Sequence, residues 1–164
     1  MTSQPVRPNP YVGPRSFQQG ERIYGREREI RELLDLLIAE RIVLLHSPSG
    51  AGKSSLVQAG LLPHLEEEGF RVLPTVRVNL EPPPALCDVD GFNRYAFSAI
   101  LSLEEDLPGE ETAPQEALAC MTLEGYLANR PKGDSAPDTE VIIFDQFEEI
   151  LTLNATDREV KMAF

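Results

Sequence analysis

The chain has 164 residues, room for one domain with an adequate core, and a formal net charge of −12. This charge argues against a general nucleic-acid surface or an anionic membrane surface, because both partners are themselves polyanions. No apolar run is long enough to span a bilayer, and the first ten residues lack the apolar core of a signal peptide, so we expect a cytoplasmic protein. The two cysteines and two histidines match no metal-binding spacing.

The first segment, residues 1–22, is rich in proline and predicts an extended, largely irregular arm. Apolar residues then recur at helical spacing from Glu27 onward and predict an amphipathic helix. These apolar residues are Ile30, Leu33, Leu34, Leu37 and Ile38. A continuous apolar run at 42–45 predicts a short strand covered on both faces. We therefore divide the chain into the arm, 1–22, and a folded part, 23–164.

A candidate phosphate-binding loop follows that predicted strand and is the strongest motif of the chain. The loop reads Ser47-Pro48-Ser49-Gly50-Ala51-Gly52-Lys53-Ser54, with Ser47 where the usual pattern has a glycine. Small residues let successive backbone N–H groups curl around a β-phosphate at the positive end of the next helix. Lys53 would reach the β- and γ-phosphates, and the Ser54 hydroxyl would ligate Mg²⁺. The alternative is a turn with a solvated lysine. Pro63 then either breaks the helix after the loop or begins a new turn.

Strands and helices alternate through the second half of the chain. Residues 70–80 predict a second strand, and Asn93 suits the N-cap of the helix that follows it. A weaker helical pattern covers 115–129, and 147–164 reads as helical with a break near residue 154. This alternation indicates an α/β domain with a mainly parallel sheet.

The apolar run 141–144 delivers Asp145 to the carboxyl end of a further predicted strand, the edge where ligands bind in open α/β sheets. A phosphate-loop protein needs a carboxylate there to hold Mg²⁺ beside the loop serine, although an aspartate that caps the next turn is the alternative. Glu148 or Glu149 could orient and polarise the attacking water, but acidic residues also favour a first helical turn through the helix dipole. Gln146 is a third candidate, because an amide can orient water.

Together these motifs resemble the novel STAND NTPases of bacteria. The residues that carry the resemblance are Tyr24-Gly25-Arg26-Glu27, the loop extended through Ser55 and Leu56, Ala59-Gly60-Leu61-Leu62-Pro63, Arg77, Asn93-Arg94-Tyr95, and Ile143-Phe144-Asp145-Gln146-Phe147-Glu148-Glu149-Ile150. The resemblance implies a three-layer P-loop NTPase sandwich that works as an ATP-operated signalling switch. It places Gly25 and Arg26 near the adenine, with a surface charge at a helix start as the alternative for Arg26. The nucleotide-binding candidates are then Gly25, Arg26, Ser47, Pro48, Ser49, Gly50, Ala51, Gly52, Lys53, Ser54 and Ser55.

The resemblance also implies parts that this sequence does not contain. In the family, a strand that comes later in the sequence lies between the phosphate-loop strand and the aspartate strand. We therefore expect an incomplete sheet and a chain that is the front piece of a longer NTPase. The family often has an acidic residue directly after the magnesium aspartate. Gln146 occupies that position here, which leaves the water-activating role to Glu148 or Glu149.

The leading interpretation is a Mg²⁺-dependent ATP-binding module of a STAND-type signalling NTPase. Lys53 cradles phosphate, Ser54 and Asp145 hold Mg²⁺, and Glu148 or Glu149 positions water. We expect slow ATP hydrolysis by the intact protein and weak or no hydrolysis by this chain alone. The alternatives are a P-loop nucleotide or small-molecule kinase and a non-catalytic interaction module or remnant. Expected partners are ATP and, in the longer protein, further copies or sensor and effector domains, but no nucleic acid and no membrane.

Overall fold

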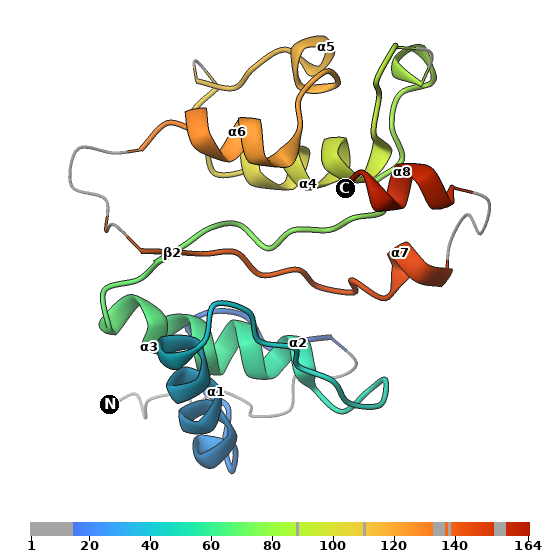
Figure 1. Ribbon diagram of the computed structural model, residues 1–164. Coiled ribbons are helices and arrows are strands. Elements are labelled where there is room, and N and C mark those ends of the chain that lie inside the picture. Colours follow the sequence, from blue (N-terminus) through green and yellow to red (C-terminus); the bar gives the residue numbers. More distant parts are fainter. Residues whose placement is uncertain (1–14, 88, 110, 133–136, 138, 153–156) are drawn as a thin grey trace, which may run out of the picture. The chain divides into compact units, whose positions relative to one another are not determined.

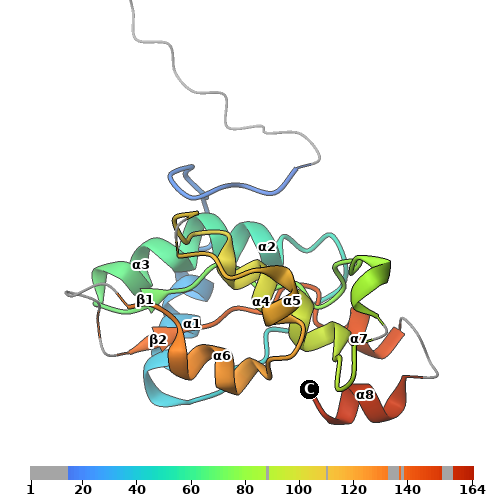
Figure 2. The same ribbon diagram turned by 90° about the horizontal axis from the view of Figure 1, so that it is seen from above.

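The structure is a computed structural model that describes residues 15–87, 89–109, 111–132, 137, 139–152 and 157–164. Figure 1 and Figure 2 draw its helices and strands from two directions. The chain divides into two compact units, Met1–Phe70 and Arg71–Phe164, and each unit is described by itself. Within the described residues, no helix combines the length and apolar character that crossing a bilayer requires.

The first unit contains α1, Glu27–Ala39, and a second helical run assembled from three consecutive pieces. The pieces are α2, Lys53–Ser55, the π-helix η1, Leu56–Leu61, and α3, Leu62–Glu67. Ile30 of α1 lies against Gly60, where a Cβ atom would come within 2.7 Å of Ile30 Cδ1. The missing side chain at Gly60 therefore allows the close approach of α1 to the second helical run. The helix predicted from Glu27 is confirmed, although Ile38 near its end is exposed.

Pro63 does not end the second helical run but occupies its first α-helical turn after the π-helix. Proline has no N–H to donate, so an α-helical bond to the fourth preceding carbonyl cannot form there. The turn before it widens instead, and the Leu62 N–H reaches the carbonyl of Val57. The His64 ring lies with Nδ1 2.8 Å from the Gly60 carbonyl oxygen. Of the two outcomes predicted for Pro63, the structure shows the new turn.

The strand predicted at 42–45 is wrong for this structure. The segment is assigned no helix or strand, and Ile42 and Leu44 are 90% and 86% exposed rather than covered. Among the described residues, none of its backbone groups is hydrogen-bonded to another backbone group. An apolar run becomes a strand only when a neighbouring strand accepts its ladder hydrogen bonds. Within the part of the chain that the structure describes, no strand pairs with this run.

The sheet of the second unit pairs β1, Arg71–Val72, with β2, Glu140–Val141, in parallel. The pairing extends as a parallel bridge between Val76 and Phe144, so the strand predicted before Asp145 and part of the one predicted at 70–80 are present. Leu73 N–H donates to the Val141 carbonyl, and Val76 N–H donates to the Ile143 carbonyl. The first strand thus advances three residues where its partner advances two. This one-residue bulge contains Pro74, a position that proline tolerates in a strand.

The second unit also contains helical elements before and after β2. They are η2, Pro84–Leu86 (a 3₁₀ turn), α4, Arg94–Glu104, α5, Gln115–Leu118, α6, Leu123–Asn129, α7, Glu149–Thr152, and α8, Arg158–Met162. Asn93 caps α4 as predicted, because its side-chain oxygen accepts hydrogen bonds from the backbone N–H groups of Tyr95 and Ala96, two and three residues further on. The pattern at 115–129 is split into α5 and α6, and the break predicted near residue 154 lies outside the described residues. These findings support a mixed α/β unit with a parallel strand pair, while the three-layer sandwich stays a prediction.

Two serines of α4 hold the chain beyond the bridge at Val76. Ser98 Oγ donates to the Arg77 carbonyl at 2.7 Å and accepts from Leu80 N at 2.8 Å. Ser102 Oγ accepts from Arg77 N at 3.1 Å. Both serines are buried, and their hydroxyls satisfy the hydrogen-bonding groups of this backbone segment. We call Ser98 and Ser102 the serine clip.

A buried polar cluster joins α4 to α6. Tyr126 Oη donates to Glu104 Oε1 at 2.6 Å, and Ala113 N donates to Glu104 Oε2 at 2.9 Å. Arg130 donates to the Leu103 carbonyl at 2.9 Å and forms an ion pair with Asp106. Burial, followed by the hydrogen bond to Glu104, raises the pKa of Tyr126 to about 12.

Candidate functional site

The predicted phosphate loop has the backbone geometry that its glycines permit. Gly50 and Gly52 adopt positive φ angles of 80° and 81°, which residues with a Cβ rarely accept. Nothing lies within 4 Å of the Cβ position at either glycine. Gly52 is the residue before α2, and Leu56 N donates to its carbonyl at 2.9 Å. The loop therefore feeds directly into the second helical run.

The Lys53 side chain folds back over this loop. Its Nζ donates to the carbonyl oxygens of Ser47 at 2.9 Å and Pro48 at 3.5 Å. A lysine ammonium has three donors and no acceptor, so oxygen atoms are its natural partners. The loop carbonyls are the partners seen here, and phosphate oxygens could take their place. Ser54, the predicted Mg²⁺ ligand, is half-buried at the first turn of the helix.

Arg26 reaches the phosphate loop from the start of α1. One terminal nitrogen donates to the Ala51 carbonyl at 3.3 Å, and the other pairs with Glu29 at 3.0 Å. Gly25 has a φ angle of 72°, and its N–H donates to Glu27 Oε1 at 3.3 Å. The structure thus brings Arg26 and the loop together, although 25 residues separate Arg26 from Ala51 in the chain. Arg26 is also exposed at the N-cap of α1, so both the adenine-side role and the surface-charge alternative stay predictions.

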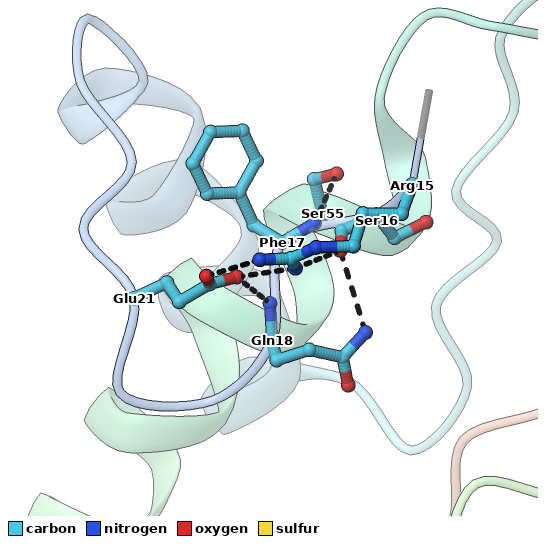
Figure 3. A network of polar contacts seen from close by, with 6 residues as sticks. All are labelled: Arg15, Ser16, Phe17, Gln18, Glu21 and Ser55. Carbon is cyan, nitrogen blue, oxygen red and sulfur yellow. Dashed lines mark hydrogen bonds and ion pairs between the residues drawn. The ribbon is translucent and has the colours of Figure 1, made fainter. Parts of the chain in front are cut away.

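Ser55, the last of the nucleotide-binding candidates, faces a different partner. Its Oγ accepts a hydrogen bond from Phe17 N at 3.1 Å, as Figure 3 shows. Sequence reasoning did not find this partner of the loop helix. The donor is a backbone N–H, which every residue except proline carries, so the residue type does not indicate the contact. The sequence predicts this part of the chain only as an irregular arm.

The predicted magnesium aspartate closes the strand pair of the second unit. Asp145 N donates to the Val76 carbonyl at 3.0 Å, and Asp145 Oδ1 accepts from Gln146 N at 3.0 Å. Gln146 has a φ angle of 56°, a left-handed conformation that costs a residue with a side chain more than a glycine. Among the described residues it is the one position other than glycine with positive φ. Backbone strain of this kind is often found at functional sites, and here it lies directly beside the carboxylate.

Glu148 and Glu149 lie at the start of α7, two and three residues beyond Gln146. Glu148 is exposed and Glu149 is half-buried. Glu149 N donates to the Gln146 carbonyl at 2.9 Å, which ties the helix to the turn after Asp145. Both positions are compatible with the two interpretations of these acidic residues, water activation and a favourable helix start. Their roles stay predictions.

The predicted site residues fall into two groups that the structure forms separately. Gly25, Arg26 and the loop belong to the first unit, and Asp145 with the following turn belongs to the second. Within the described residues, no cluster of three or more His, Cys, Asp or Glu side chains could hold a metal ion. The shared Mg²⁺ site of Ser54 and Asp145 is therefore a proposal. Its hydroxyl and carboxylate oxygens are the hard donors that Mg²⁺ prefers.

The first unit also contains a pocket of about 270 Å³ lined by α1, the chain before it and the second helical run. Its lining includes Ile23, Ile30 and Gly60, with charged residues from the arm and from α1 around them. This pocket lies beside the close contact of α1 with the second helical run. No sequence pattern predicted this pocket.

Left-handed glycines that lead into a helix, with a lysine over the loop, are typical of proteins that bind nucleoside triphosphates. The comparison with protein families agrees with this class, because the family model described as Novel STAND NTPase 1 matches residues 10–164. The chain belongs to this family, which confirms the resemblance seen in the sequence. No curated protein and no solved structure matches the chain.

Proposed function

We propose that this chain is the Mg²⁺-dependent ATP-binding module of a STAND-type signalling NTPase. The observation that carries the proposal is the loop, where Gly50 and Gly52 leave open space and Lys53 lies over carbonyl oxygens. Membership of an NTPase family supports the same conclusion.

Binding of a triphosphate exchanges the partners of the Lys53 ammonium. The two bonds to Ser47 and Pro48 break, and the ammonium turns to the β- and γ-phosphate oxygens. Backbone N–H groups of the loop and of the first helical turn then donate to the phosphates. Arg26 fixes Ala51 through its carbonyl and so keeps the loop in place from the side of α1.

Ser54 and Asp145 would hold Mg²⁺, which supplies charge neutralisation at the transferred phosphate when it is bound. Gln146 N holds one oxygen of Asp145, so the orientation of this carboxylate is fixed by the turn itself. Glu148 or Glu149 positions the attacking water, and Gln146 offers an amide for the same task. We expect hydrolysis to be slow in the intact protein and weaker in this chain alone.

Thermal unfolding with and without nucleotide tests the proposal. A ligand that binds only the folded state raises the midpoint temperature of unfolding, because at a concentration of 100 Kd it adds about 2.7 kcal/mol to the free energy of unfolding. We expect ATP with Mg²⁺ to stabilise the wild type and to have little effect on Lys53→Ala. Lys132→Ala is the matched control, because it removes a lysine that pairs with Glu140 in the other unit. Absence of any shift for the wild type at millimolar ATP would refute ATP binding.

A further inference from the structure

The end of the arm, residues 15–21, folds on itself. The Arg15 guanidinium donates to both carboxylate oxygens of Glu21, at 2.8 and 2.6 Å, and Gln18 N donates to Glu21 Oε2 at 2.8 Å. Figure 3 shows the Glu21 carboxylate turned toward both donors. These hydrogen bonds, that of Arg15 first, lower the pKa of Glu21 to about 2. A bidentate ion pair of this kind fixes the geometry of both side chains. We call residues 15–21 the arm segment.

The arm segment is attached to the second helical run at two places. Phe17 N donates to Ser55 Oγ at 3.1 Å, in the turn that follows the phosphate loop. Gln19 Nε2 donates to both carboxylate oxygens of Glu66, at 3.0 and 3.1 Å, in the last helical turn. The segment thus contacts the helical run near both of its ends. Ser55 directly follows Ser54, so the first attachment lies one residue from the proposed Mg²⁺ ligand.

We propose that Ser55 is a positioning residue whose hydroxyl holds the arm segment against α2, the first turn of the second helical run. The arm segment and bound ATP then stabilise one another. This inference rests on the proposed function. The Ser55 hydroxyl accepts from Phe17 and is therefore turned to the arm, whereas Ser54 serves the metal. A fixed first turn keeps its N–H groups in the geometry that phosphate needs, and this preorganisation lowers the cost of binding.

Reciprocity gives the proposal a second, independent consequence. If the attached arm segment increases affinity for ATP by some factor, bound ATP must stabilise the attachment by the same factor. A purely structural tether would behave differently. Its loss would lower the stability of the fold but leave the affinity for ATP unchanged.

The first experiment measures ATP affinity of the 164-residue chain and its variants. Ser55→Ala and Glu21→Gln should each weaken binding about 2- to 10-fold, the range expected for one hydrogen bond. Ser55→Ala removes the attachment, and Glu21→Gln loosens the arm segment that makes it. Because both changes act on one contact, the double variant should be no weaker than the more affected single variant. Glu32→Gln is the matched control, since it removes the carboxylate of an ion pair on α1 that does not contact the arm segment.

Metal dependence separates Ser55 from its neighbour. Ser55→Ala should lose the same factor in the presence of Mg²⁺ and of EDTA. Ser54→Ala should lose affinity only where Mg²⁺ is present. An effect of Ser55→Ala that disappears in EDTA would overturn the positioning role and make Ser55 part of the metal site.

The second experiment follows hydrogen exchange of the Phe17 amide. Saturating ATP should slow this exchange by about the factor that Ser55→Ala costs in affinity, and Ser55→Ala should speed it without nucleotide. The Leu80 amide, which also donates to a serine hydroxyl, should not respond to Ser55→Ala.

Unchanged affinity in Ser55→Ala, or additive losses in the double variant, would overturn the inference while ATP binding stands. If the wild type does not bind ATP, the proposed function and the coupling both fail. The Phe17 amide then still decides whether the contact with Ser55 forms.

Discussion

Replacement of Ser98 by alanine tests how the serine clip supports the second unit. Its hydroxyl is fully buried and serves two backbone groups, the Arg77 carbonyl and the Leu80 N–H. Ser98→Ala leaves both groups without their partner, and each unmade bond of this kind costs about 1–3 kcal/mol. Because Arg77 and Leu80 are less buried than Ser98, we expect a total near the lower end, about 2–4 kcal/mol.

Urea denaturation measures this loss as a lower midpoint with an unchanged slope. For a chain of this size the melting temperature should fall by roughly 4–16 °C. Ser102→Ala is the comparison, because Ser102 accepts only one bond from outside its helix, that of Arg77 N. We expect it to cost about 1 kcal/mol.

The clip also supports the candidate site. Asp145 N donates to the Val76 carbonyl, one residue before the clipped segment. Exchange of the Asp145 amide should therefore be faster in Ser98→Ala than in the wild type. A loss below about 1 kcal/mol for Ser98→Ala, or a larger loss for Ser102→Ala, would refute the assignment of two dependent backbone groups to Ser98.

The remaining predictions concern single titrating or strained groups. The absorbance titration of the tyrosines should contain a component near pH 12 that is missing from Tyr126→Phe. Because the folded pKa of Tyr126 is raised, its stabilising effect is present below pH 10 and is lost as the pH rises toward 12. A component near pH 10 that Tyr126→Phe removes would contradict the burial of this hydroxyl. NMR of the Glu21 carboxyl should show a pKa of about 2, and in Arg15→Ala this pKa should return toward its ordinary value. Because the folded pKa is lowered, the stabilisation of the arm segment by Glu21 is present above the unfolded pKa and is lost as the pH falls toward 2. Because φ is positive at Gln146, Gln146→Gly should raise the free energy of unfolding by up to about 1 kcal/mol, and Gln146→Val should lower it. Urea denaturation measures both values. If Gln146→Val proves more stable than Gln146→Gly, the backbone at this position is not strained.

Features set by neighbouring residues in the chain could be predicted from the sequence. The helix at α1 follows from the spacing of its apolar residues, and the cap at Asn93 follows from a side chain that reaches its own next turn. The glycines of the phosphate loop belong to the same class, because their positive φ angles depend on the residues themselves. The strand before Asp145 was predicted from its apolar run alone, and this prediction holds because the run has a partner strand among the described residues.

Features that depend on a distant partner could not be predicted. The run at 42–45 has the composition of a strand, but composition cannot show whether a neighbouring strand is present. Glu104 and Tyr126 lie 22 residues apart on different helices, and no sequence pattern connects them. Only the packing of α4 on α6 brings them together as a buried pair. The contact of Phe17 with Ser55 uses a backbone amide, which every residue except proline carries.

At the bulge that contains Pro74, the number of residues in the strand matters as much as which residues they are. Side chains alternate between the two faces of a strand, so residues three apart, such as Leu73 and Val76, ordinarily point to opposite faces. Here both belong to one buried cluster, because the extra residue between them resets the alternation. Deleting Pro74 would turn Val76 and the residues after it to the other face, and the alignment of Asp145 with Val76 would go with them. Replacing Pro74 would leave the count intact, so the number of residues before Val76 constrains this strand more tightly than the identity of the residue that fills the bulge.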